Sequence, residues 1–167
     1  MKTRIIFVLL ITFLIGCKTE PKEKITAEVF VFNLKNMNER LKIDFQKLEL
    51  DKNHPNLLNP SISKDSIKSV YASWTKLHQD LNIFLKKKNF DWGIEDEKIK
   101  LFNKIYFTEN GQIKIYAYNI FNEVTEEKAR MYGELVKEFS KGIRISVERD
   151  FDFAQCGKIV FPNLKKL

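Results

Sequence analysis

The stretch KIKLFNKIYFTENGQIKIYAYNIF, from Lys98 to Phe121, decides the fold because it places two strand-forming runs around a turn signal. Isoleucine, phenylalanine and tyrosine favour strands, and Asn110-Gly111 between them is typical of a β-hairpin. A two-residue turn would put Lys114 on the same face as Ile105 and Phe107. We therefore expect a three-residue turn with Gly111 as a left-handed bulge, which keeps the parity of the side chains across the hairpin.

This parity divides the hairpin into an apolar face and an aromatic-basic face. The apolar face is expected to carry Leu101, Ile105, Phe107, Ile113, Ile115, Ala117 and Phe121. The opposite face is then expected to carry Phe102, Lys104, Tyr106, Lys114, Tyr116 and Tyr118. Two interpretations stay open, since either helices cover these rings or the rings form an exposed patch that suits a protein partner, a glycan or lipid headgroups.

Three segments around the hairpin have the apolar spacing of amphipathic helices, and each opens with an aliphatic residue followed by Ser or Thr. These pairs are Ile25-Thr26, Ile62-Ser63 and Val124-Thr125. The apolar stripes predict one helix from Thr26 to about Leu48, a second from Ser63 to about Phe84, and a third from Glu126 to about Lys141. Gly142 stands where a left-handed helix cap is expected.

After the third helix, Ile143 to Glu148 alternates apolar and polar residues as a half-buried strand does, and Gly157 to Phe161 is suited to a last strand. We therefore predict an α+β fold. Two N-terminal helices, a hairpin, a further helix and one or two strands would form a small antiparallel sheet with helices packed on it.

The chain begins with an apolar run from Ile5 to Ile15, which Lys2 and Arg4 precede. As a helix this run would span about 16 Å, whereas the hydrocarbon core of a bilayer is about 30 Å thick. It is too short to cross. A basic start, a short apolar run and a small residue at its end are the layout of a secretory signal.

At the end of that run, Leu14-Ile15-Gly16-Cys17 resembles the lipobox of bacterial lipoproteins. The resemblance implies that residues 1–16 are a cleaved signal peptide and that Cys17 becomes the first mature residue, carrying fatty acyl chains. Several such chains together hold a protein on a membrane. An ordinary cleaved signal with an incidental cysteine is the alternative. Residues 17–24 form a polar tether, and residues 25–167 are expected to be one domain.

The charge and composition of the chain limit the kinds of partner and ligand that we expect. The whole chain carries a net charge of +7, and removal of Lys2 and Arg4 with the signal leaves +5. The lysines are spread along the chain, which is typical of a solvated surface, and nucleic acid is not an expected partner of an exported lipoprotein. The loop with Asp51, Asn53 and His54 lacks the spacing of a calcium loop. We expect no metal site and no cofactor.

Cys156 is the second cysteine, and a lipidated Cys17 has no thiol to pair with it. A small buried side chain is the interpretation we favour, with an intermolecular disulfide or a catalytic thiol as alternatives. An envelope hydrolase or thiol enzyme would need Cys156 to converge with His78 and with Asp150 or Asp152.

The order hairpin, helix and closing strand, with YFTENGQIKIY at its centre, is similar to the ββαβ arrangement of the TonB C-terminal domain. That resemblance implies binding by addition of a partner's extended segment to a free sheet edge, which we expect near Ile143 to Val147. The sequence thus predicts a non-enzymatic binding or assembly module, anchored to the cell membrane or outer membrane and facing the periplasm or the cell surface. Its partner would be an envelope protein or a glycan.

Overall fold

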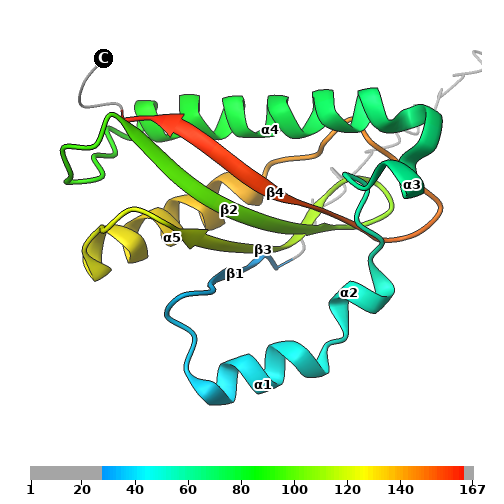
Figure 1. Cartoon of the computed structure of the whole chain (residues 1–167), viewed down its shortest axis with the longest axis horizontal. Coiled ribbons are helices and arrows are strands. Elements are labelled where there is room, and N and C mark those ends of the chain that lie inside the picture. Colours follow the sequence, from blue (N-terminus) through cyan, green and yellow to red (C-terminus); the bar gives the residue numbers. More distant parts are fainter. Residues whose placement is uncertain (1–27, 164–167) are drawn as a thin grey trace, which may run out of the picture.

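A computed structural model describes residues 28–163, which form an α+β fold around a four-stranded sheet (Figure 1). The strands are β1 (Phe30–Asn33), β2 (Lys98–Phe107), β3 (Ile113–Ile120) and β4 (Phe153–Pro162), in the order β1-β3-β2-β4. Strand β1 is parallel to β3, whereas β2 is antiparallel to both β3 and β4. The sheet is therefore mixed, not antiparallel as predicted, and it is open, with β1 and β4 at its edges.

The helices divide the sheet into two faces. They are α1 (Glu39–Lys47), α2 (Leu50–Asn53), α3 (Pro60–Ser63), the 3₁₀ helix η1 (Lys64–Ser66), α4 (Ile67–Lys87) and α5 (Glu126–Ser140). Helices α4 and α5 pack on one face, which we call the helix-covered face, and enclose the main hydrophobic core. On the other face, called the open face, a smaller cluster with Phe45 and Leu50 packs against Tyr106 and Ile115.

The predicted start of the first helix is wrong. Phe30–Asn33 is the edge strand β1, and the helix α1 begins only at Glu39. Alternating aromatic and β-branched residues favour a strand, which pairs with β3 from Phe30 opposite Ile115 to Asn33 opposite Tyr118. Asn38 caps α1, because its side chain accepts a hydrogen bond from the amide of Leu41 at 2.8 Å.

The other two predicted helices are present, with one difference in how they begin. Thr125 caps α5 by accepting a hydrogen bond from the Lys128 amide at 3.3 Å, as the sequence indicates. Helix α4 begins at Ile67 instead of Ser63, since the Ser63 hydroxyl donates to the carbonyl of Leu57 at 2.6 Å and holds the preceding loop. Gly142 does not form the expected left-handed cap.

The hairpin turn has the predicted form. The Thr108 amide donates to the carbonyl of Gln112 at 2.9 Å across a three-residue turn, and Gly111 is left-handed, with φ of 76°. A second irregularity follows, because Phe107 is opposite Ile113 whereas Tyr106 is opposite Ile115. Lys114 is thus an extra residue on β3, and this bulge reverses the parity of the hairpin beyond it.

The reversal makes the predicted faces wrong over most of the hairpin. Ile105 lies opposite Tyr116 and Asn103 lies opposite Tyr118, all on the helix-covered face, while Lys104 lies opposite Ala117 on the open face. Beyond the bulge, the side chains of β2 and β3 therefore share faces as they would in a hairpin with a two-residue turn, although the turn itself has three residues.

The predicted strand from Ile143 to Glu148 is not a strand. Its alternation does bury Ile145 and Val147 in the main core. The backbone of this segment, however, bonds to the hairpin turn, with the Ile145 amide donating to the Gly111 carbonyl at 2.9 Å and Arg149 to Glu109 at 2.9 Å. The free sheet edge that we expected here is absent, and the last strand β4 is longer than predicted and occupies the edge instead.

Candidate functional site

Two of the tyrosines assigned to an aromatic-basic face lie in the core. Tyr116 and Tyr118 are buried on the helix-covered face. The Tyr116 hydroxyl accepts a hydrogen bond from the Asn103 amide at 2.7 Å, and the Tyr118 hydroxyl donates to the carbonyl of Ala129 at 2.8 Å. Burial raises the pKa of Tyr118 to about 12. Of the two interpretations left open, coverage by helices holds for Tyr116 and Tyr118, and the bulge at Lys114 places them on the face opposite to Tyr106.

Tyr106 does lie on the open face, but beneath α1 and α2. Its hydroxyl donates to Asp51 at 2.9 Å, and Lys104 donates to the same carboxylate at 2.6 Å. Burial alone would raise the pKa of Asp51, yet these two hydrogen bonds and the charge of Lys104 hold it below its usual range. Lys114 is likewise paired, with Asp152 at 2.6 Å. The candidate binding residues of the aromatic-basic face therefore do not form one accessible surface; these are Lys104, Tyr106, Lys114, Tyr116 and Tyr118.

A different basic surface does exist on the open face. It consists of Lys98 and Lys100 on β2 and Lys158 on β4, and we call these three residues the lysine strip. No carboxylate in the described part of the chain forms an ion pair with any of them. Exposed apolar side chains accompany them: Val160 lies opposite Lys100, and the ammonium of Lys158 lies 5.9 Å from the ring centre of Phe121.

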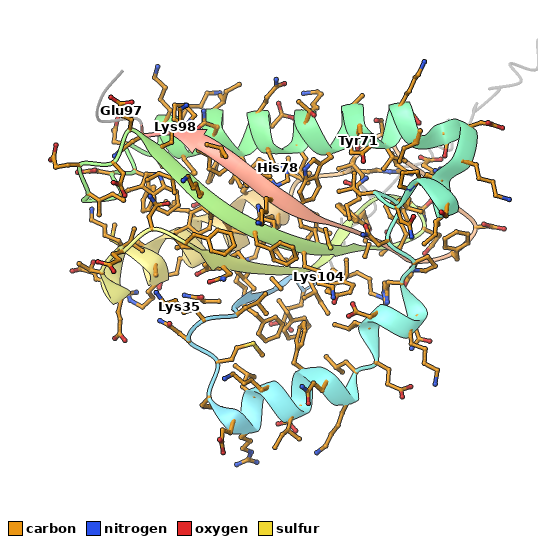
Figure 2. All side chains as sticks on the ribbon, in the orientation of Figure 1. Lys35, Tyr71, His78, Glu97, Lys98 and Lys104 are labelled. Atoms are coloured by element: carbon orange, nitrogen blue, oxygen red, sulfur yellow. The ribbon has the colours of Figure 1, made fainter. Side chains whose placement is uncertain are left out.

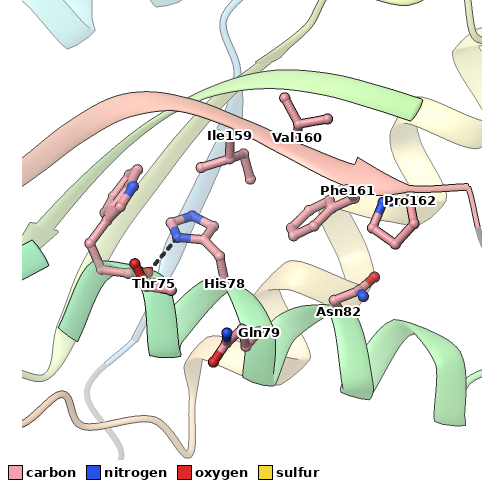
Figure 3. A pocket seen from close by; sticks show the side chains of 9 residues that line it. Thr75, His78, Gln79, Asn82, Ile159, Val160, Phe161 and Pro162 are labelled. Carbon is pink, nitrogen blue, oxygen red and sulfur yellow. Dashed lines mark hydrogen bonds between the residues drawn. The ribbon is translucent and has the colours of Figure 1, made fainter. Parts of the chain in front are cut away.

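On the other side of β4, a groove of about 280 Å³ separates this strand from α4 (Figure 3). Helix α4 contributes Trp74, Thr75, His78, Gln79 and Asn82, and β4 contributes Ile159, Val160, Phe161 and Pro162. The groove combines aromatic and aliphatic walls with a few amide side chains. That composition is typical of pockets that accept an apolar group and orient it with polar contacts.

His78 is a neutral wall of this groove. Its Nδ1 donates to the carbonyl of Trp74 at 2.8 Å, and its Nε2 accepts from the Asn103 side chain at 2.9 Å, between α4 and the sheet (Figure 2). Burial lowers the pKa of His78 to about 4, against the opposing effect of the Trp74 carbonyl. The imidazole is therefore uncharged near neutral pH and holds α4 on the central strand β2.

Strand β4 also presents unpaired backbone groups along its outer edge. Backbone groups of a strand point alternately to its two sides. The Ala154 amide donates outward to the carbonyl of Pro55 at 2.9 Å, whereas the Asn163 amide donates inward to Glu97 at 2.8 Å. The amides of Lys158 and Val160 share the parity of Ala154 and so point outward. In residues 28–163, no backbone group pairs with them.

The outer edge is unpaired over only part of β4. Near its start, Pro55 and Leu57 pair with Ala154, and the Asn56 side chain accepts from the Cys156 amide at 3.2 Å. Beyond Lys158 the edge runs beside the groove as far as Pro162. A lysine and a proline on a strand are common features of edge strands, so Lys158 and Pro162 are the sequence signal of this edge.

The residues proposed for a thiol enzyme do not come together. Cys156 lies opposite Lys104 on the open face, whereas His78 bonds to Asn103 on the helix-covered face. Asp152 accepts from Lys114 and lies 3.6 Å from His54. Burial raises the pKa of the Cys156 thiol, with Lys104 opposing this effect, so the reactive thiolate is disfavoured.

Metal-ligand geometry, helix hydropathy and similarity to known proteins give no additional support for a function. No group of three potential ligand residues within the described ranges is arranged to hold a metal ion. None of the helices described here is both long and apolar enough to cross a membrane. In comparisons with protein-family models, curated proteins and solved structures, nothing matches this chain. Cys17 and the signal segment lie outside the described residues.

Proposed function

We propose that this protein is a non-enzymatic binding module that accepts an extended segment of a partner protein as an additional strand beside β4. The observation that carries the proposal is the unpaired outer edge at Lys158 and Val160, which lies directly beside the groove under α4. Backbone groups of such an edge supply affinity without regard to sequence, and an adjacent pocket for alternate side chains supplies specificity.

The groove is suited to this role because its two walls, one from α4 and one from β4, are already formed without a partner. Trp74 and His78 on α4 face Ile159 and Phe161 on β4, and both rings on α4 are held in place by packing against each other at 4.1 Å between centroids. Neither wall needs to move for an extended chain to lie along β4. A preformed site loses less conformational entropy on binding than one that must be ordered.

We further propose that the module is anchored through a lipidated Cys17 in the cell membrane or the outer membrane, facing the periplasm or the cell surface. The support is the sequence Leu14-Ile15-Gly16-Cys17 after a short apolar run. The partner is then an envelope protein, and the proposal includes no cofactor. In an exported protein anchored to the membrane, strand addition at β4 would hold the partner's segment at the membrane surface.

Val160→Pro tests the edge. Proline removes one outward amide and its ring occupies the space of the incoming strand, while the inward hydrogen bonds of β4 to β2 remain. Val160→Ala is the matched control, because it removes the same exposed side chain and keeps the amide. A photo-crosslinking residue placed at Asn82, on the rim of the groove, reports capture of the partner in intact envelopes.

We expect Val160→Pro to reduce partner capture at least about tenfold, since it removes a hydrogen bond worth about 1 kcal/mol and adds a steric clash. Val160→Ala should reduce capture far less than Val160→Pro, because it keeps the outward amide. Thermal melts of both variants should lie near that of the parent, which shows that the fold is intact. Equal capture by the proline variant, with an unchanged melt, would contradict strand addition at β4.

A further inference from the structure

We infer that the segment accepted at β4 alternates apolar and acidic side chains. This inference rests on the strand addition proposed above and concerns the chemistry of the partner. A strand added to an edge continues the pleat of the sheet, so its successive side chains point to the two faces in turn. The two faces beside β4 differ sharply in character, and the partner must match both.

Side chains that point to the helix-covered side enter the groove. Its deeper walls are Trp74, His78 and Phe161, and all three are largely buried and carry no charge at neutral pH. A carboxylate placed here would lose hydration without gaining a cation, because neither wall of the groove contributes a lysine or arginine. Aliphatic or aromatic side chains are therefore favoured at every second position of the partner.

Side chains that point to the open side meet the lysine strip. Lys158 is on the edge strand itself, about 4.8 Å from the backbone of an added strand, and Lys100 lies one strand further in, opposite Val160. No carboxylate of the described chain neutralises these lysines, although Lys104 and Lys114 on the same sheet are both paired. Opposite charges on neighbouring strands attract, so the intervening positions favour Glu or Asp.

Charge complementarity thus assigns different side chains to the odd-numbered and even-numbered positions of the partner segment. An exclusively apolar segment would leave the lysine strip without a counter-charge, and an exclusively acidic one would place carboxylates in the groove. The exposed side chain of Val160 lies opposite Lys100 on the edge strand, so the stems of long acidic residues such as Glu have apolar surface to cover as they reach that ammonium group.

The test measures binding of short labelled peptides to the full-length protein in detergent by fluorescence anisotropy. One peptide alternates Val and Glu, a second alternates Val and Thr, a third alternates Val and Lys, and a fourth has the composition of the first with the valines and glutamates in separate blocks. At low salt we expect the Val-Glu peptide to bind roughly three- to tenfold more tightly than the Val-Thr peptide, since each exposed ion pair contributes roughly two- to fivefold.

The Val-Lys and blocked peptides should bind most weakly, and added salt should remove the advantage of glutamate. Lys158→Glu should remove the preference, so that Val-Glu binds no more tightly than Val-Thr, while the thermal melt stays unchanged. Lys87→Glu, which alters a lysine on α4 that does not line the groove, is the matched control and should leave the preference as it is.

Equal binding of the Val-Glu and Val-Thr peptides would overturn the acidic part of the inference and leave strand addition standing. Equal binding of the alternating and blocked Val-Glu peptides would overturn the alternation. If no alternating peptide binds, strand addition at β4 is itself refuted and the inference with it.

Discussion

Gly111 offers a sharp test of how the hairpin turn supports the rest of the fold. It is left-handed, with φ of 76°, a conformation that costs other residues about 1–2 kcal/mol. Its surroundings add a second constraint. A Cβ built at this position would lie 2.7 Å from the carbonyl oxygen of Ile145 and 2.8 Å from that of Val147.

We therefore expect Gly111→Ala to reduce the free energy of unfolding by about 1.5–3.5 kcal/mol. The backbone oxygens cannot rotate away as a flexible side chain would, so the segment with Ile145 and Val147 must shift. That shift weakens the hydrogen bond from the Ile145 amide to the Gly111 carbonyl, at 2.9 Å, which contributes about 0.5–1.5 kcal/mol. The conformational cost and the lost bond together give the stated range.

The measurement is urea denaturation of the two proteins, with amide hydrogen exchange at Ile145 as a local readout. Gly142→Ala is the matched control, because nothing lies within 4 Å of its added Cβ and its φ is not left-handed, and its effect should stay within about 0.5 kcal/mol. Gly111→Asn separates the two causes, since asparagine tolerates the left-handed conformation but still carries a Cβ.

If the contact with the two carbonyls matters, Gly111→Asn should destabilise the protein by at least about 1 kcal/mol and the Ile145 amide should exchange faster than in the parent. If Gly111→Ala unfolds at the same urea concentration as the parent, both the turn and its contact with the segment after α5 are wrongly assigned.

Three further predictions concern other residues. As pH falls from about 6.5 to about 4, the unfolded chain takes up a proton that buried His78 resists, so the parent should lose about 3 kcal/mol of unfolding free energy that His78→Gln does not lose, as urea titrations at several pH values would show. Tyr106→Phe removes the hydrogen bond to Asp51 and should lower the free energy of unfolding by about 1 kcal/mol at pH 7, measured by the same titration. An unchanged free energy of unfolding would show that this bond does not stabilise the fold. Cys17→Ala should abolish acylation in the intact mass and release the protein from washed membranes, and full retention on the membrane would contradict lipid anchoring.

The helices were the most predictable part of the fold, because a stripe of apolar residues at helical spacing describes a single buried side. Val70, Trp74, Leu77 and Leu81 are buried as their spacing indicates, and Thr125 caps α5 as predicted. The segment from Phe30 to Asn33 misled the prediction, since its residues fit the stripe of the following helix. A four-residue edge strand whose partner is more than eighty positions away along the chain leaves little local signal.

The faces of the hairpin could not be read from its sequence for a related reason. Strand β3 is central and buried on both sides, so Ile115 and Ala117 on one face are as apolar as Tyr116 and Ile120 on the other. Alternation identifies the buried face only when the other face is polar. The extra residue Lys114, paired with Asp152, looks in sequence like any solvent-facing position, and nothing local marks it as a bulge.

The presence of a free sheet edge was predictable, but its place was not. Binding at a free sheet edge was expected at Ile143 to Val147, yet that segment bonds to the hairpin turn, and the unpaired edge lies at Lys158 and Val160. The groove beside it depends on the packing of α4 against β4. Elements so distant in sequence are brought together only by the tertiary fold, so no sequence motif records the groove.

The outer edge of β4 also bears on how concentrated this protein can be before its copies associate. Two copies meeting edge to edge in antiparallel fashion would bring Lys158 of one near Lys158 of the other on the same face, where like charges repel. Pro162 supplies no amide and ends the run of donors after Val160. The edge is thus long enough to hold one short segment, yet too short and too basic to propagate into a continuous sheet of identical chains, which protects the protein from aggregation.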